Sequence, residues 1–131
     1  MRTFKLLLPA LFAATALLLS FASAAADKAT AIYYHADWCP NCQALAPKFK
    51  SASSNLSDQL DILVMDYTNM ETTGASQRRA LELGLFEVIA NNRHTGFVLL
   101  LDSDRNEVGR LYRTMDVGEI RQQLTDLASG S

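Results

Sequence analysis

The two cysteines of this chain, Cys39 and Cys42, constrain its fold most, because they lie where a strand pattern gives way to a helix pattern. The preceding residues, 29–35 (ATAIYYH), are β-branched and aromatic, which is typical of a β-strand. From Cys39 to about Leu56 apolar residues recur at helical spacing. Pro40 falls in the first turn of this helix, where a missing N–H costs nothing. The pair is therefore predicted to mark the beginning of a helix.

The segments that follow alternate between strand and helix patterns. Pro47 should kink the first helix, and Gly84 is a candidate break in the second. Asp116 followed by Glu119 resembles a capping box that begins the last helix. The predicted elements are strands at 29–35, 60–68, 95–102 and 108–113 and helices at 39–56, 74–90 and 117–127. This β-α-β-α-β-β-α order predicts an α/β fold, a mixed central sheet of about four strands with helices on both faces.

Residues 1–26 have the composition of a secretory signal peptide. Two basic residues precede an apolar run, and small residues offer cleavage sites after Ala24 or Ala26. We therefore expect a signal peptide at 1–24, a single domain at 25–131 and an exported, periplasmic protein. The alternative is an uncleaved membrane anchor facing the periplasm, because the apolar run could just span a bilayer.

The charge of the expected domain restricts its partners. Without the two basic residues of the signal, 10 basic residues remain against 14 acidic ones, a net charge of −4. A mildly acidic domain with no basic stripe is not expected to bind nucleic acid. No membrane association is expected after signal cleavage, and the absence of a dimerisation segment favours a monomer. Export would place the cysteines where disulfides can persist.

Three roles for the cysteine pair can be weighed on physical grounds. A disulfide across so short a loop would stabilise the fold by only about 2 kcal/mol, less than one joining distant segments. A closed zinc site needs four ligands, and beyond one cysteine pair the chain has only His35 and His94. Haem attachment requires a histidine directly after the second cysteine, where Gln43 stands.

The third role is that of a chemical reagent. At a helix N-terminus, unpaired N–H groups and the helix dipole stabilise a thiolate, which would lower the pKa of Cys39. Cys42, one turn further along, would be shielded beneath the helix. It could then attack a mixed disulfide formed at Cys39 and release the reduced substrate.

The segment YYHADWCPNCQALAPKF, residues 33–49, resembles the active-site segment of thioredoxin-like disulfide oxidoreductases. The likeness covers about residues 29–127, without the first strand and helix of full-length thioredoxins. It implies a trimmed thioredoxin-like fold in which Cys39 attacks, Cys42 resolves and Trp38 flanks the site. It also implies protein thiol or disulfide substrates, a redox partner protein and no cofactor.

Two substitutions depart from the family pattern. Tyr33 takes the place of the buried aspartate that helps to move the proton of the second cysteine. Tyrosine, with a reference pKa of about 10, is a poor base, so proton transfer must use water or another group. Gly96, after Thr95, takes the place of the cis-proline that contacts bound peptide. The substrate groove should therefore differ, and an open approach there would also admit a metal ion.

Several other residues are candidates for tuning the pair. Residues 86–94 appear as extra sequence, so His94 at their end, or His35 at the strand end, could stabilise the Cys39 thiolate or bind metal. The alternative for each is an ordinary surface or loop histidine. Asp66 could approach the buried thiol or be a solvated acid at a strand end.

In this family the two residues between the cysteines, here Pro40 and Asn41, tune the redox poise. Proline first is typical of periplasmic oxidases, but no histidine follows it, so the direction of electron flow is left open. The leading hypothesis is an exported protein disulfide oxidoreductase. The alternatives are a copper- or zinc-handling module that uses Cys39, Cys42 and a histidine, and a partner-binding domain whose disulfide is vestigial.

Overall fold

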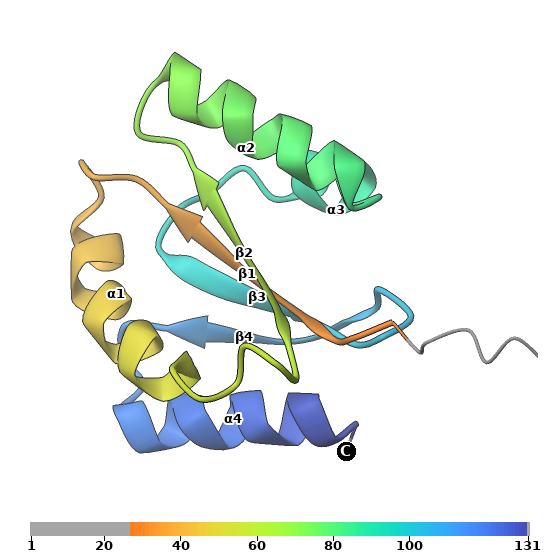
Figure 1. The fold of residues 1–131 in the computed structure, drawn as a ribbon. Coiled ribbons are helices and arrows are strands. Elements are labelled where there is room, and N and C mark those ends of the chain that lie inside the picture. The colour runs from red at the N-terminus through yellow and green to blue at the C-terminus, as the bar shows by residue number, and fades with distance from the viewer. Residues whose placement is uncertain (1–26, 131) are drawn as a thin grey trace, which may run out of the picture.

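The structure, a computed structural model, describes residues 27–130, in which a four-stranded sheet carries helices on both faces (Figure 1). The expected signal peptide and its cleavage sites lie outside the described residues. The strands are β1 (Thr30–His35), β2 (Asp61–Asp66), β3 (Phe97–Leu101) and β4 (Glu107–Tyr112). The helices are α1 (Pro40–Ser53), α2 (Met70–Glu82), α3 (Phe86–Asn91) and α4 (Val117–Ser129).

The sheet is mixed, with the strand order β2-β1-β3-β4. β1 pairs in parallel with β2 and antiparallel with β3, which in turn forms an antiparallel hairpin with β4. The predicted mixed sheet of four strands is thus confirmed. β1 lies between two neighbours and is buried at every position except His35, so its carboxyl end is held firmly where the cysteine segment begins.

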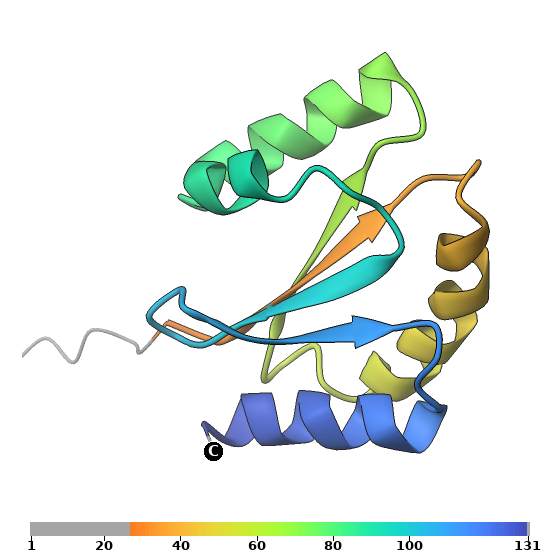
Figure 2. The same cartoon turned by 180° about the vertical axis from the view of Figure 1, so that it is seen from behind.

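The two faces of the sheet are covered by different helices (Figures 1 and 2). α1 and α4 pack together on one face, and α2 and α3 lie on the other. Because side chains alternate along a strand, Ala31 and Tyr33 of β1 join the core beneath α1 and α4, while Ile32 and Tyr34 join the core beneath α2. The neighbouring residues Tyr33 and Tyr34 are therefore buried on opposite faces of the sheet.

The cores are built mainly from aliphatic side chains. Leu45 of α1, Leu111 of β4 and two residues of α4, Ile120 and Leu124, have no exposed surface. Burial of each such side chain contributes about 1.5–3 kcal/mol, so the α1–α4 contact fixes α1 against the sheet. Pro47 lies inside α1, which continues to Ser53.

The predicted second helix is displaced and divided. α2 begins at Met70 rather than at Gly74, because Asn69 and Thr72 form a capping box. The first turn of this helix is mostly polar, so the spacing of apolar residues did not reveal it. The helix ends at Glu82, and Gly84, with a φ of 69°, provides the expected break before α3. The extra sequence 86–94 thus forms a short helix and a loop.

The predicted capping box at the start of α4 is confirmed. The Asp116 carboxylate accepts a 2.9 Å hydrogen bond from the Glu119 N–H, and the Glu119 carboxylate accepts one of 2.8 Å from the Asp116 N–H. α4 extends to Ser129, two residues beyond the prediction, and ends at Gly130 in the left-handed conformation. Between residues 27 and 130, no helix has the length and apolar character needed to cross a membrane.

The cap of α4 provides a test of the fold. Replacing Asp116 with alanine removes the acceptor for an N-terminal N–H and should lower the free energy of unfolding by about 1 kcal/mol. The control is Glu82→Ala, which removes only an exposed pair with Arg79 and should cost no more than about 0.5 kcal/mol. Urea unfolding of both variants measures the difference, and equal losses would contradict the capping role.

Candidate active site

Cys39 is the N-cap residue of α1. Its backbone is extended, with φ −93° and ψ 112°, and its sulfur accepts a 3.2 Å hydrogen bond from the Cys42 N–H. A side-chain acceptor at this position satisfies an N–H group that has no partner within the helix. Both cysteines are free thiols, and the structure thus confirms that the pair lies at the beginning of a helix.

The surroundings of Cys39 favour its ionised form. Burial acts to raise the pKa of Cys39, but hydrogen bonds from the Cys42 thiol and the Thr95 side chain oppose it. The backbone N–H groups of Cys42 and Asn41 add to this effect, and the net result is a lowered pKa. The thiolate form of Cys39 is therefore favoured over that of an ordinary cysteine.

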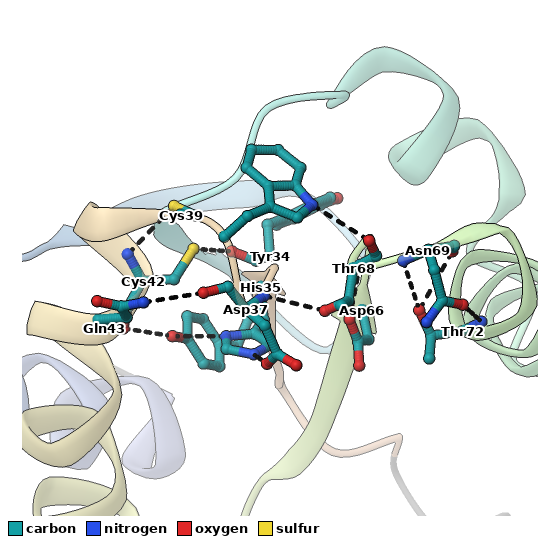
Figure 3. A network of polar contacts seen from close by, with 12 residues as sticks. Tyr34, His35, Asp37, Cys39, Cys42, Gln43, Asp66, Thr68, Asn69 and Thr72 are labelled. Carbon is teal, nitrogen blue, oxygen red and sulfur yellow. Dashed lines mark hydrogen bonds and ion pairs between the residues drawn. The ribbon is translucent and has the colours of Figure 1, made fainter.

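Cys42 has the opposite character, although it lies only one turn further along α1. It has no exposed surface, and burial followed by its interaction with Cys39 raises the pKa of Cys42 to about 11. Its thiol points to the Tyr34 carbonyl oxygen at 3.6 Å (Figure 3). One helical turn thus places a thiol with a lowered pKa next to a thiol that is shielded from solvent.

Cys39 is less accessible than the sequence suggested. Only 5% of its surface is exposed, because the backbone at Gly96 lies over it. A Cβ at Gly96 would lie 2.7 Å from the Asn41 Cβ and 3.4 Å from the Cys39 sulfur. The expected open approach at this position is therefore wrong. Gly96 adopts a φ of 93°, and residues 27–130 contain no cis peptide bond.

The loop before β3 is fastened to the active-site strand. The Gly96 N–H donates a 2.8 Å hydrogen bond to the Tyr34 carbonyl, the same oxygen to which the Cys42 thiol points. The Thr95 side chain, directly before it, hydrogen-bonds to both cysteines; this bond helps to lower the pKa of Cys39 and partly opposes the burial that raises the pKa of Cys42. Thr95 and Gly96, both expected near the cysteines, are thus brought beside them.

The turn between β1 and α1 is stabilised by hydrogen bonds with Thr68, which follows β2, and with Gln43 of α1. The Asp37 N–H donates to the Thr68 hydroxyl at 3.0 Å, and the Trp38 indole donates to the Thr68 carbonyl at 3.2 Å (Figure 3). The Gln43 amide donates to the Asp37 carbonyl at 2.9 Å. Trp38 remains 63% exposed beside the cysteines and is available to contact a partner.

Thr68 was not identified from the sequence, although a signal for it existed. It follows β2, which was predicted as a strand, and carboxyl ends of neighbouring parallel strands meet at one edge of a sheet. Polar residues after β2 therefore had to lie near the cysteine turn. Pro40 and Asn41, the two tuning residues predicted between the cysteines, lie exposed in the first turn of α1.

Tyr33, which replaces the carboxylate of the family pattern, contacts Cys42 through its hydroxyl. The hydroxyl donates a 2.9 Å hydrogen bond to the Cys42 carbonyl. Burial raises the pKa of Tyr33, and the nearby Cys42 and Cys39 thiols raise it further. Its ring packs against Phe49 of α1, with 5.5 Å between ring centroids.

His35 interacts with two neighbours in sequence and has no hydrogen bond to Cys39. Its Nδ1 lies 3.3 Å from the Tyr33 hydroxyl, and its Nε2 lies 3.0 Å from the Asp37 carboxylate. Tyr33 and His35 are two residues apart in β1, and residues at this spacing in a strand point to the same face of the sheet. Their contact could therefore have been predicted from the sequence. The sequence analysis considered His35 as a partner of Cys39, as a metal ligand or as an ordinary surface histidine, and did not identify its contact with Tyr33.

Within residues 27–130, neither of the two remaining candidates, His94 and Asp66, forms a hydrogen bond with the thiols. His94 lies exposed in the loop after α3. The Asp66 carboxylate accepts a 2.8 Å hydrogen bond from the Thr68 N–H, which fits the strand-end alternative. Burial acts to raise the pKa of Asp66, but the bonds from Thr68 and the nearby His35 lower it overall. Within residues 27–130, no three histidine, cysteine or carboxylate side chains gather as metal ligands, so the metal hypothesis gains no support.

Comparisons with known proteins agree with this arrangement. Residues 18–80 match the sequence family described as Thioredoxin. The chain is similar in structure to a thiol:disulfide interchange protein of the thioredoxin family from Chlorobium tepidum TLS, with 12% identity, a TM-score of 0.54 and coverage of 77% of this chain and 80% of that one. It is also similar to MTB DsbF, with 14% identity, a TM-score of 0.52 and coverage of 76% and 81%. These likenesses establish a thioredoxin-like fold, whereas no curated protein sequence matches the chain.

The contact at Gly96 predicts a large effect of a single methyl group. Gly96→Ala should lower the free energy of unfolding by about 2–3 kcal/mol, because it adds a clash with Asn41 to an unfavourable positive φ. The matched control is Gly84→Ala, which also has a positive φ but no atom within 4 Å of the new Cβ. That variant should lose only about 1 kcal/mol in denaturant unfolding. Equal losses would show that Gly96 is not packed against the active site.

The role of Thr95 is open to a titration. Thr95→Val removes a hydrogen bond to the Cys39 sulfur and should therefore raise the pKa of Cys39. The thiolate absorbance of the reduced protein, followed against pH, should show its first inflection at higher pH than in the unaltered protein. Thr114→Val, at an exposed turn, is the control and should leave the inflection in place. An unchanged inflection in Thr95→Val would exclude this role.

Proposed function

We propose that this thioredoxin-like chain is a thiol–disulfide oxidoreductase that acts on protein cysteines in the periplasm. The observation that carries the proposal is the contrast between two thiols on one helical turn. The pKa of Cys39 is lowered at the helix N-terminus, whereas burial raises that of Cys42 to about 11. Catalysis of dithiol exchange needs one ionised thiol to attack and a second, protected thiol to resolve.

The reaction follows from these two states. The Cys39 thiolate attacks one sulfur of a substrate disulfide, forming a mixed disulfide and releasing the other substrate sulfur as a thiolate. Cys42 then loses its proton and attacks the Cys39 sulfur. The Cys39–Cys42 disulfide forms, the bond to the substrate breaks, and the substrate has gained the two electrons that the cysteine pair has lost. The reverse sequence oxidises a substrate dithiol.

The electrons are carried entirely by sulfur, so the proposal includes no cofactor. It does include a redox partner protein that returns the pair to its starting state. Trp38, Pro40 and Asn41 are exposed next to Cys39 in the sequence. The loop residues Thr95 and Gly96 lie close to the Cys39 sulfur. We assign to these five residues the binding of substrate and the tuning of the pair.

The proposal places the active domain at residues 25–131 and an export signal at residues 1–24. The signal-like composition of the first residues supports a periplasmic location. The family match and the structural neighbours support the reaction class, since one neighbour is described as a thiol:disulfide interchange protein. The cysteine pair on this fold supports the same class from the sequence itself.

Trapping of partners tests the mechanism directly. Cys42→Ser removes the resolving thiol, so mixed disulfides between Cys39 and substrate proteins should accumulate in cells and appear as adducts on non-reducing gels. Cys39→Ser is the matched control and should form no adducts, while turnover in a disulfide exchange assay should fall by about 100-fold or more in both variants. If Cys42→Ser yields no adducts, the exchange mechanism is refuted.

Equilibration with glutathione assigns the direction of electron flow. A reduction potential near that of thioredoxin, about −270 mV, corresponds to a reductant of protein disulfides. A potential near about −120 mV corresponds to an oxidant. The measurement uses the purified protein, with the ratio of free thiols to disulfide read after acid quenching.

A further inference from the structure

A groove between α2 and α3 lies outside the cysteine site. It is lined by side chains from both helices, by Tyr67 after β2 and by Arg93 in the loop before β3. The volume of this α2–α3 groove is about 450 Å³, within the range of about 300–1,000 Å³ that is usual for ligand pockets. The groove therefore has room for a large side chain of a partner.

Large apolar side chains line the α2–α3 groove. Ile89 of α3 is only 5% exposed, whereas Leu81 of α2 and Phe86 of α3 have 53% and 56% of their surfaces exposed. Single apolar residues on a protein surface are common, but two large ones that line one groove mark a place where an apolar group can bind. Because α3 is formed by the extra sequence 86–94, the groove is a feature of this chain and not of the family pattern.

One wall of the groove is fixed by aromatic stacking. The Tyr67 ring stacks on Tyr34 with 6.3 Å between ring centroids, and Tyr34 stacks on Phe97 with 4.7 Å. Tyr34 and Phe97 are buried in β1 and β3, so the sheet holds the Tyr67 ring in one orientation. The Tyr67 N–H also donates a 2.8 Å hydrogen bond to the His35 carbonyl. A wall that is already in place lowers the entropy lost when a ligand binds.

Arg93 brings a positive charge to the groove. Its Nε donates a 3.4 Å hydrogen bond to the Ala90 carbonyl, and among the described residues its side chain forms no ion pair. None of the described residues that line the groove is acidic. Burial raises the pKa of Tyr67, and Arg93 lies close enough to oppose this effect. A carboxylate bound beside the apolar side chains would therefore meet an unpaired guanidinium, which can donate charged hydrogen bonds to it.

Two short segments connect the groove to the cysteine site. Tyr67 directly precedes Thr68, whose carbonyl accepts the 3.2 Å hydrogen bond from the Trp38 indole. Arg93 lies two residues before Thr95, whose side chain is hydrogen-bonded to both thiols. Figure 2 shows the loop from α3 running to the start of β3, at the end of the sheet where β1 leads into α1. The part of the groove formed by Tyr67 and Arg93 therefore adjoins the surface around the cysteines.

We infer that the α2–α3 groove binds an apolar side chain of the protein whose disulfide is exchanged at Cys39, and that Arg93 pairs with an acidic side chain next to it. The inference rests on the oxidoreductase function proposed above. It defines the substrate class as protein segments in which an apolar residue adjoins an acidic one within a few residues of the reacting cysteine. The groove contributes binding alone, and the exchange between sulfur atoms proceeds as described above.

Synthetic peptides test this inference. Each peptide carries one cysteine in a disulfide with an aromatic thiol, and the coloured aromatic thiolate is released when Cys39 attacks the peptide sulfur. A Leu-Glu, Leu-Lys or Ala-Ala pair is placed at successive positions on either side of the cysteine. The reduced protein is mixed with each peptide below saturation, and the second-order rate constant is measured at low and at high salt. A small aromatic disulfide without a peptide measures the reactivity of Cys39 alone.

At low salt the best-placed Leu-Glu peptide should react with the unaltered protein about 10-fold faster than the matching Leu-Lys peptide, and high salt should reduce this preference. Arg93→Glu should reverse the preference, and Phe86→Ala should slow both leucine peptides towards the rate of the Ala-Ala peptide. The matched control is Arg78→Glu, which makes the same charge change at an exposed residue of α2 that does not line the groove. This control should keep the preference, and all three variants should react with the small disulfide as the unaltered protein does.

Equal rates for the Leu-Glu and Leu-Lys peptides, or a preference that persists in Arg93→Glu, would overturn the inference. A reversal in Arg78→Glu would overturn it as well, because net charge alone would then explain the result. So would variants that slow the small disulfide as much as the peptides, because the change would then act on Cys39 itself. Failure of the proposed function looks different. In that case no peptide would react faster with the unaltered protein than with glutathione, and no Cys39–Cys42 disulfide would form afterwards.

Discussion

The hydrogen bond from the Cys42 N–H to the Cys39 sulfur is the contact on which the active site depends. Helix N-termini leave N–H groups without partners, and a serine or aspartate oxygen commonly fills that role. Here the acceptor is the Cys39 sulfur itself, so one contact begins α1 and favours the thiolate. Disulfide formation removes the negative charge from this cap. Stabilisation of the helix N-terminus therefore favours the reduced, ionised pair and makes the disulfide a stronger oxidant.

The same helical turn gives the two thiols opposite properties because it places them at different depths. Cys39 receives N–H donors at the helix end, whereas Cys42 lies against the sheet with no exposed surface. Burying an unpaired carboxylate is costly. With Tyr33 in place of the aspartate of the family pattern, this buried region carries no such charge. The cost of that choice appears in the resolving step, where a neutral tyrosine cannot itself take a proton. Depth protects the second thiol and also separates it from bulk solvent.

Local patterns predicted most of the fold, and contacts between distant segments account for what was missed. The strands followed from runs of β-branched, aromatic and apolar residues, and the beginnings of α1 and α4 followed from Pro40 and the Asp116 capping box. The start of α2 was missed because its first turn carries few apolar residues. In the site, the cysteine pair was local and predictable, whereas the bond from Asp37 to Thr68 joins residues 31 apart. Such a contact depends on the parallel pairing of β1 and β2, and the register of that pairing cannot be predicted from local sequence patterns.

The covering of Cys39 by Gly96 bears on how the site selects its reactions. A thiolate with 5% of its surface exposed is shielded from small oxidants, to which an exposed low-pKa thiol would be vulnerable. Gly96 is fixed to the Tyr34 carbonyl by a single backbone hydrogen bond at this point of the loop. In the proposed exchange reaction, a substrate segment that pairs with this backbone, or displaces it, would gain access to the sulfur, whereas a small disulfide has little binding energy with which to do so. Because any side chain at position 96 would press on Asn41, only glycine allows the loop to lie this close to the cysteines.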